Sequence, residues 1–96
     1  MLTEKEAWLY IADRLRTTFS DDSGTYYFVN GYRCYGICNA ISRMYQSDQI
    51  SVRILLSMFD KLHCLPNINI NRYYWTTTVH GSLARIKFCQ EQASKL

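Results

Sequence analysis

Two stretches of the sequence combine arginine with tyrosine, and their residue types suit the binding of an anionic ligand. In the first, Arg33, Tyr35 and Gly36 follow the turn-forming pair Asn30-Gly31 and lead into a predicted helix. The free amides and the dipole at a helix start favour an anion, and arginine offers a forked donor to phosphate. Gly36 lets the backbone approach a ligand closely because glycine has no Cβ. The alternative is that Arg33 is a solvated residue and Gly36 a close-packing one.

The second stretch is Arg72-Tyr73-Tyr74, followed by Trp75 and, in a predicted C-terminal helix, by Arg85. Neighbouring side chains in an extended chain point in opposite directions, so at least one of these rings faces outward or towards a partner subunit. Aromatic rings stack on nucleobases, which contributes about 1–3 kcal/mol per base. The two stretches together predict a nucleotide-binding set. The alternative is that Trp75 anchors the loop and the tyrosines cover the edge of the core.

Nothing in the residue pattern points to catalysis. His63 and His80 have no acid or nucleophile nearby in a recognised arrangement, and the glycine spacing of phosphate- and dinucleotide-binding loops is missing. Asp21-Asp22 is a carboxylate pair, but it lies in a turn-forming stretch where solvation explains it. We therefore expect a non-catalytic protein that uses no cofactor.

The cysteines are expected to be small buried core residues that hold no metal. The first six residues lack the basic-then-apolar layout of a signal peptide, so we expect reduced thiols in the cytoplasm. Paired zinc ligands usually follow a Cys-x2-Cys pattern, whereas the closest pair here is spaced Cys-x3-Cys within a predicted helix. The cysteines are Cys34, Cys38, Cys64 and Cys89.

Four helices are predicted to position these residues. The first begins with a capping box, in which Thr3 and Glu6 each satisfy an amide of the other, and its apolar residues keep helical spacing as far as Phe19. Ser51 begins the third helix, and Thr78 caps the last one. The predicted helices cover residues 4–19, 35–45, 51–65 and 78–94.

The segments between these helices are predicted to be loops rich in aromatic residues. Residues 26–29 (Tyr-Tyr-Phe-Val) could form a strand or an ordered loop, and the loop is favoured because no strong partner strand is visible. Residues 67–71 alternate with period two, but their three asparagines disfavour a strand. The predicted core includes Trp8, Leu15, Ile41, Leu55, Phe59 and Ile86.

Length and composition describe one small domain over residues 1–96, mostly α, with four helices and aromatic-rich connecting loops. The chain is 48% hydrophobic, which excludes a disordered protein, and no apolar run is long enough to span a bilayer. Residues 53–96 carry six basic and two acidic side chains, and the whole chain carries a net charge of +3. This charge is too small to indicate nucleic-acid binding, but it suits a small anion or an acidic partner.

Aromatic residues are more frequent than one small core requires. Eight tyrosines, four phenylalanines and two tryptophans make up 15% of the chain. Because tyrosine is amphipathic and enriched at interfaces, the surplus predicts a homo-oligomer or a binding surface. The expected subunit contacts are Tyr26, Tyr27 and Phe28, or Tyr73 and Tyr74.

The motifs resemble those of a loose group of small phage-encoded proteins. Members of the group show Gly-Leu-Cys-x-x-Ile, a Tyr-Trp-Trp-Pro-like box, Thr-x-Glu-Gly and Arg-x-x-Phe-Cys. This chain differs from them at Tyr74, Thr76 and His80, where the group favours Trp, Pro and Glu. The matching residues are Gly36-Ile37-Cys38-Asn39-Ala40-Ile41, Tyr73-Tyr74-Trp75, Thr78, Gly81, Arg85, Phe88 and Cys89.

The resemblance implies a phage protein that acts in the host cytoplasm. Small accessory phage proteins often counter host immunity by sequestering a nucleotide messenger or by capping a host protein. We expect a non-catalytic anti-defence protein that sequesters a nucleotide-derived signalling molecule. One alternative is a protein–protein inhibitor or adaptor that acts on a host defence protein. A small helical module that binds nucleic acid is the less expected alternative.

Overall fold

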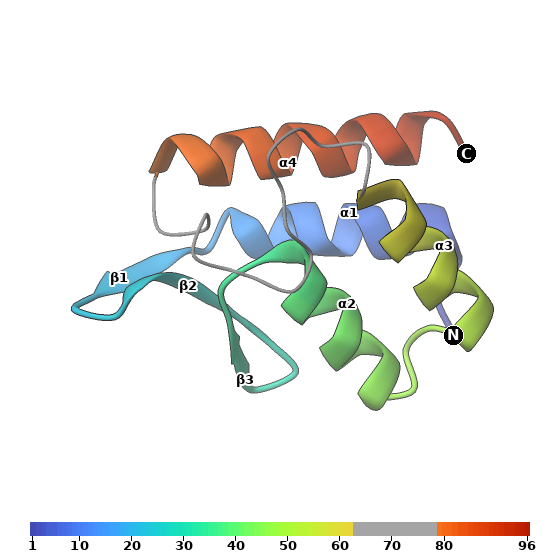
Figure 1. Cartoon of the computed structure of the whole chain (residues 1–96), viewed down its shortest axis with the longest axis horizontal. Coiled ribbons are helices and arrows are strands. Elements are labelled where there is room, and N and C mark those ends of the chain that lie inside the picture. The colour runs from blue at the N-terminus through green and yellow to red at the C-terminus, as the bar shows by residue number, and fades with distance from the viewer. Residues whose placement is uncertain (63–78) are drawn as a thin grey trace.

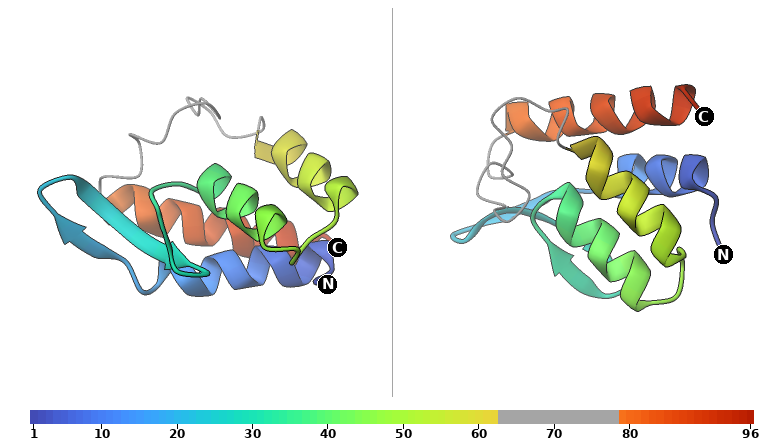
Figure 2. Two further views of the ribbon diagram at one scale, coloured as in Figure 1. Left: turned by 90° about the horizontal axis from the view of Figure 1, so that it is seen from below. Right: turned by 45° about the vertical axis from the view of Figure 1, so that its right-hand side comes forward.

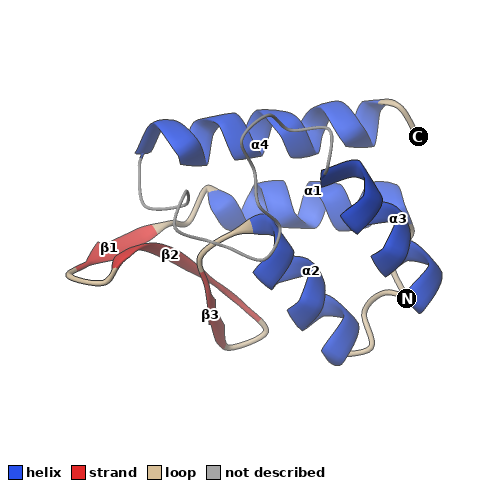
Figure 3. Ribbon diagram, viewed as in Figure 1, coloured by secondary structure: helices blue, strands red, loops and turns tan. Residues whose placement is uncertain are grey.

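The computed structural model describes residues 1–62 and 79–96, with side chains from residue 83 onward in the second range. Within these residues the chain forms four helices and one three-stranded antiparallel sheet (Figures 1 and 3). The prediction of a mostly α four-helix domain with aromatic loops was therefore wrong, because the segment before the second helix is a sheet. The elements are α1 (Glu4–Leu15), β1 (Phe19–Asp21), β2 (Gly24–Val29), β3 (Tyr32–Cys34), α2 (Ile37–Gln46), α3 (Val52–Leu62) and α4 (Val79–Ser94).

Helix α1 begins as predicted but ends four residues earlier than Phe19. The capping box is confirmed, since the Glu6 amide donates to the Thr3 hydroxyl at 3.1 Å and the Thr3 amide donates to Glu6 Oε1 at 2.8 Å. At the other end, the Thr17 hydroxyl donates to the Arg14 carbonyl at 2.7 Å. Thr17 and Thr18 are β-branched and favour extended backbone over helix. The chain therefore leaves the helix and enters β1.

The sheet consists of two short hairpins that share the central strand β2. Between β2 and β3, Asn30 and Gly31 both have positive φ, 54° and 84°, as a type I′ turn requires. Between β1 and β2, the Asp21 carboxylate accepts from the Ser23 amide at 2.8 Å. Each outer strand has only three residues, and this shortness is the reason why no partner strand was visible in the sequence.

The core lies where α1, β2, α2 and α4 meet. Helices α1 and α4 run side by side, with the sheet beyond the end of α1 and α3 near its start (Figures 1 and 2). The rings of Trp8 on α1 and Phe88 on α4 meet edge to face, with centroids 5.6 Å apart. Of the predicted core residues, Trp8, Leu15 and Ile41 are fully buried. The remaining three are half-buried against this core: Leu55, Phe59 and Ile86.

On helix α3 the most deeply buried residues lie beside the predicted core residues Leu55 and Phe59, which are half-buried. Met58 and Leu62 are its buried residues, whereas Val52 and Leu56 are 53% and 63% exposed. Residues four apart lie on one face of a helix, so burying the row through Met58 and Leu62 turns Val52 and Leu56 outward. Leu83 on α4 is likewise 63% exposed.

The second and fourth helices follow their predicted ranges closely. Helix α2 begins at Ile37, two residues later than predicted, because Gly36 is its N-cap and has extended backbone. The predictions for His63, Cys64, the loop of residues 67–71, and the cap at Thr78 lie outside the described residues. Each helix in the described residues is too short or too polar to span a lipid bilayer.

Candidate functional site

The alternation of side chains along β2 creates an exposed aromatic surface on the outer side of the sheet. Thr25, Tyr27 and Val29 are buried, whereas Tyr26 and Phe28 are half-buried and lie on the opposite face. Successive side chains of a strand point to opposite faces. The residues that were predicted to form an aromatic loop therefore alternate between the core and the outer surface. We call the outer surface the aromatic face: Phe19, Tyr26, Phe28, Arg33 and Tyr35.

Strand pairing brings the rings of the aromatic face into contact. Phe19 pairs with Tyr26 across β1 and β2, and Phe28 pairs with Arg33 across β2 and β3. The Tyr26 ring centroid lies 5.8 Å from that of Phe19, 5.6 Å from that of Phe28 and 6.3 Å from that of Tyr35. These distances fall within the 4.5–7 Å range of favourable aromatic pairs. The rings form a continuous cluster, and Phe19 at its edge is 50% exposed.

Arg33 is the cation of the aromatic face, and three groups hold its guanidinium in place. The guanidinium lies 4.1 Å from the centroid of the Tyr26 ring, which is a cation–π contact. It donates to the Tyr35 hydroxyl at 3.3 Å and forms an ion pair with Asp21 at 3.2 Å. The Arg33 side chain remains 42% exposed. A fixed and partly exposed arginine loses little conformational entropy when a partner binds to it.

Ser23 and Asp21, in the turn between β1 and β2, complete this polar network. Hydrogen bonds from the hydroxyl and amide of Ser23 lower the pKa of Asp21. Hydrogen bonds with Ser23 and Arg33 lower the pKa of Tyr35, and the bond to Tyr35 raises the pKa of Arg33. Asp21 is therefore ionised at neutral pH, and its charge offsets that of Arg33.

Arg85 lies beneath the aromatic face, in the core. It is 2% exposed, and it donates to the Tyr35 carbonyl oxygen at 2.8 Å. Next to it, the buried Tyr27 hydroxyl donates to the Gly36 carbonyl oxygen at 2.8 Å. Gly36 is buried and has a φ of −147°, which is extended backbone open to any residue. These contacts support the backbone that carries Tyr35 from its inner side.

The structure thus brings together only part of the predicted binding set. Arg33 and Tyr35 share the aromatic face, whereas Gly36 and Arg85 lie behind it. Arg72, Tyr73 and Tyr74 lie outside the described residues. Of the expected subunit contacts, Tyr26 and Phe28 reach the surface, but Tyr27 is fully buried in its own chain.

Tyr26 and Phe28 of the aromatic face are among the predicted subunit contacts, but Phe19 and Asp21 are not among the predicted site residues. Phe19 was assigned to the first helix, and Asp21 was interpreted as a solvated turn residue. The alternation of residues 24–29 next to Asn30-Gly31 was the signal that could have revealed them, because this pair flanked by alternating residues is typical of a hairpin.

The cysteines that the structure describes are buried, as predicted. Burial raises the pKa of the Cys34 thiol to about 11 and that of the Cys89 thiol to about 12. At neutral pH these thiols are protonated, and a protonated thiol is a poor nucleophile and a poor metal ligand. In the described part of the chain, no three His, Cys, Asp or Glu side chains are grouped so that they could hold a metal ion.

The aromatic face offers rings for stacking and apolar contact and the Arg33 guanidinium for hydrogen bonding. No protein-family model, curated protein or solved structure matches this chain.

Proposed function

We propose that this protein is a non-catalytic binding module that uses the aromatic face to contact a partner protein. The observation that carries the proposal is the cluster of four rings around Arg33, a guanidinium held by Tyr26, Tyr35 and Asp21 yet still 42% exposed. Tyrosine and arginine are among the residues that contribute most to binding at protein interfaces. The resemblance to small phage-encoded proteins suggests that the partner is a host defence protein in the bacterial cytoplasm.

The charge balance of the aromatic face favours a protein partner over a free anion. Asp21 already pairs with Arg33 at 3.2 Å, so a free phosphate would have to compete with a carboxylate for the guanidinium. A protein can instead offer both a hydrogen-bond acceptor and apolar side chains, which the rings and Arg33 accommodate together. Burying the exposed ring of Phe19 and the half-buried ring of Tyr26 removes apolar surface from water and favours association.

Capture from host lysate with matched surface variants tests this proposal. The wild-type chain is expected to retain a host protein at stoichiometric level, and the purified pair should bind directly in a titration. Phe19→Ser should abolish the binding because Phe19 lies at the exposed edge of the aromatic face. Leu56→Ser is the control, since Leu56 is equally apolar and 63% exposed but lies on α3. If both variants bind the purified partner like the wild type, the aromatic face is not the interface.

A nucleotide-derived ligand is the second candidate, and the arrangement of Arg33 and Tyr35 supports it. Their side chains meet at 3.3 Å beside the ring cluster, so a phosphate could contact both while a base stacks on an exposed ring. On this reading Asp21 competes with the phosphate, and Asp21→Asn should tighten nucleotide binding. Calorimetric titration against cyclic and ADP-ribose-type nucleotides measures this effect. If neither the wild type nor Asp21→Asn binds any of these nucleotides at tens of micromolar, the nucleotide-binding hypothesis is wrong.

A further inference from the structure

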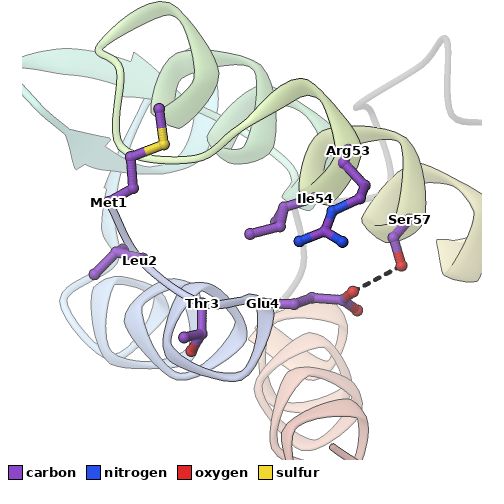
Figure 4. Close-up of a pocket in the computed structure, with 7 residues that line it drawn as sticks. All are labelled: Met1, Leu2, Thr3, Glu4, Arg53, Ile54 and Ser57. Carbon is purple, nitrogen blue, oxygen red and sulfur yellow. Dashed lines mark hydrogen bonds between the residues drawn. The ribbon is translucent and has the colours of Figure 1, made fainter.

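A cavity of about 470 Å³ lies away from the aromatic face, between the start of α1 and the helix α3 (Figure 4). Its volume lies within the range of about 300–1,000 Å³ that is typical of small-molecule sites. Figure 1 shows the sheet beyond the far end of α1, so the cavity and the aromatic face are separate surfaces. The residues that line the cavity are Met1, Leu2, Thr3, Glu4, Arg53, Ile54 and Ser57.

Glu4 forms one wall, and its charge is already compensated. Its Oε1 accepts from the Ser57 hydroxyl at 2.7 Å, and its Oε2 accepts from the Trp8 indole at 3.0 Å and from the Lys61 ammonium group. Burial acts to raise the pKa of Glu4, but these hydrogen bonds outweigh burial and lower it. Glu4 is therefore ionised at neutral pH and is paired with Lys61 across α1 and α3.

Arg53 carries an uncompensated positive charge at this cavity. Its side chain extends from the first turn of α3 towards the start of α1, on the side of the cavity opposite the first residues of the chain (Figure 4). Arg53 is exposed and makes no hydrogen bond or ion pair with any residue that the structure describes. The start of α3 adds to the positive potential, because a helix N-terminus carries partial positive charge.

Apolar side chains form the rest of the lining. Leu2 and Ile54 are half-buried and pack against the core, and Met1 is exposed at the rim. A ligand that fits this arrangement has an apolar chain to cover Leu2 and Ile54 and an acidic head for Arg53. A single negative charge suits the site better than a phosphate, because Arg53 offers one guanidinium and the Lys61 ammonium group is already paired with Glu4.

We propose that this cavity binds a medium-chain monocarboxylate, with its carboxylate on the Arg53 guanidinium and its alkyl chain on Leu2 and Ile54. Guanidinium and carboxylate match as a two-pronged pair of charge-assisted hydrogen bonds. Each further buried methylene strengthens binding about fourfold at most. Octanoate is therefore expected to bind about tenfold more tightly than hexanoate.

Titration of the full, isotopically labelled chain with octanoate, followed by amide chemical shifts, tests the proposal. Shifts are expected at residues 1–4 and 53–57, and Arg53→Gln should weaken binding about tenfold or more. Lys87→Gln is the matched control, an exposed cation on α4, and should bind octanoate like the wild type.

Three outcomes would overturn the proposal. The first is that Arg53→Gln binds octanoate like the wild type, since the variant loses an exposed side chain and is expected to fold. The second is that octanol binds as well as octanoate, which would show that the charge plays no part. The third is that no amide at residues 1–4 or 53–57 shifts at millimolar octanoate.

Discussion

Arg33 and Arg85 are one residue type in two opposite environments, and substitution should separate their roles. Arg85→Met is expected to destabilise the protein by about 1–3 kcal/mol, because it removes a buried guanidinium that donates to the Tyr35 carbonyl oxygen. Arg33→Met should leave the urea midpoint almost unchanged, since the Arg33 side chain is 42% exposed. Chemical denaturation of both variants measures the difference. Equal midpoints for the two variants would show that Arg85 contributes no structural support.

Glu4 makes the stability of the protein sensitive to acid. Burial opposes its ionisation, but hydrogen bonds from Lys61, Ser57 and Trp8 lower its pKa below the ordinary 4.5. A carboxyl whose pKa is lower in the folded state stabilises the fold above its unfolded pKa. That contribution is lost as the pH falls below 4.5 and through the folded pKa.

We therefore expect the melting temperature to fall between about pH 5 and pH 3. Glu4→Gln should start from a lower melting temperature at pH 7 and show a shallower decline. Thermal melts across this pH range compare the two proteins. Parallel curves for the variant and the wild type would contradict this role of Glu4.

At the scale of elements, helix boundaries with local signals were predictable and strand pairing was not. The capping box of Thr3 and Glu6 depends on residues three apart, and α1 begins where it predicts. The sheet depends on two three-residue strands that are stable only next to β2. Phe19 continues the helical spacing of α1, so periodicity alone placed it in the helix.

The candidate site was also predictable only in part. Arg33 and Tyr35 were identified because their residue types and their place in the sequence next to Asn30-Gly31 are enough to suggest binding. The burial of Arg85 depends on how α4 packs against α1 and the sheet, which is a contact between distant parts of the chain. No local pattern distinguishes such an arginine from an exposed one, because arginine can pack its stem on apolar surface in either case.

The capping box should contribute measurably to stability. Thr3→Ala removes the hydroxyl that accepts from the Glu6 amide at 3.1 Å, and the expected cost is about 1 kcal/mol. Thr3→Ser keeps the acceptor and serves as the control. Urea denaturation of the three proteins measures the effect. A Thr3→Ser variant as unstable as Thr3→Ala would mean that the hydroxyl is not the stabilising group.

Tyr27 joins β2 to the start of α2 through its buried hydroxyl, and this hydroxyl should contribute to the stability of the fold. Tyr27→Phe removes the buried hydrogen bond from the Tyr27 hydroxyl to the Gly36 carbonyl oxygen at 2.8 Å, while the Ala40 amide still donates to that oxygen at 3.2 Å. The expected loss is about 1 kcal/mol, that of one net hydrogen bond. Tyr26→Phe is the control, because Tyr26 is half-buried on the outer side of the same strand. A larger loss for Tyr26→Phe would contradict this assignment.

At the scale of the whole molecule, the aromatic face should also drive self-association when no partner is present. Phe19 is 50% exposed beside Tyr26 and Phe28, and stable monomers seldom expose large apolar patches. We expect light scattering to give at least the mass of a dimer at high concentration. Phe19→Ser should shift the mass towards 11.3 kDa, that of one chain. A wild-type mass near that value at high concentration would contradict the expectation.

The alternation along β2 also determines how this protein can change over generations. Its inward residues, Thr25, Tyr27 and Val29, are fixed by the core, whereas Tyr26 and Phe28 meet mainly other residues of the aromatic face. Substitutions at the outer positions can therefore alter the proposed binding surface at a small cost in folding. A lineage that must follow a changing target can vary one side of this strand while selection conserves the other.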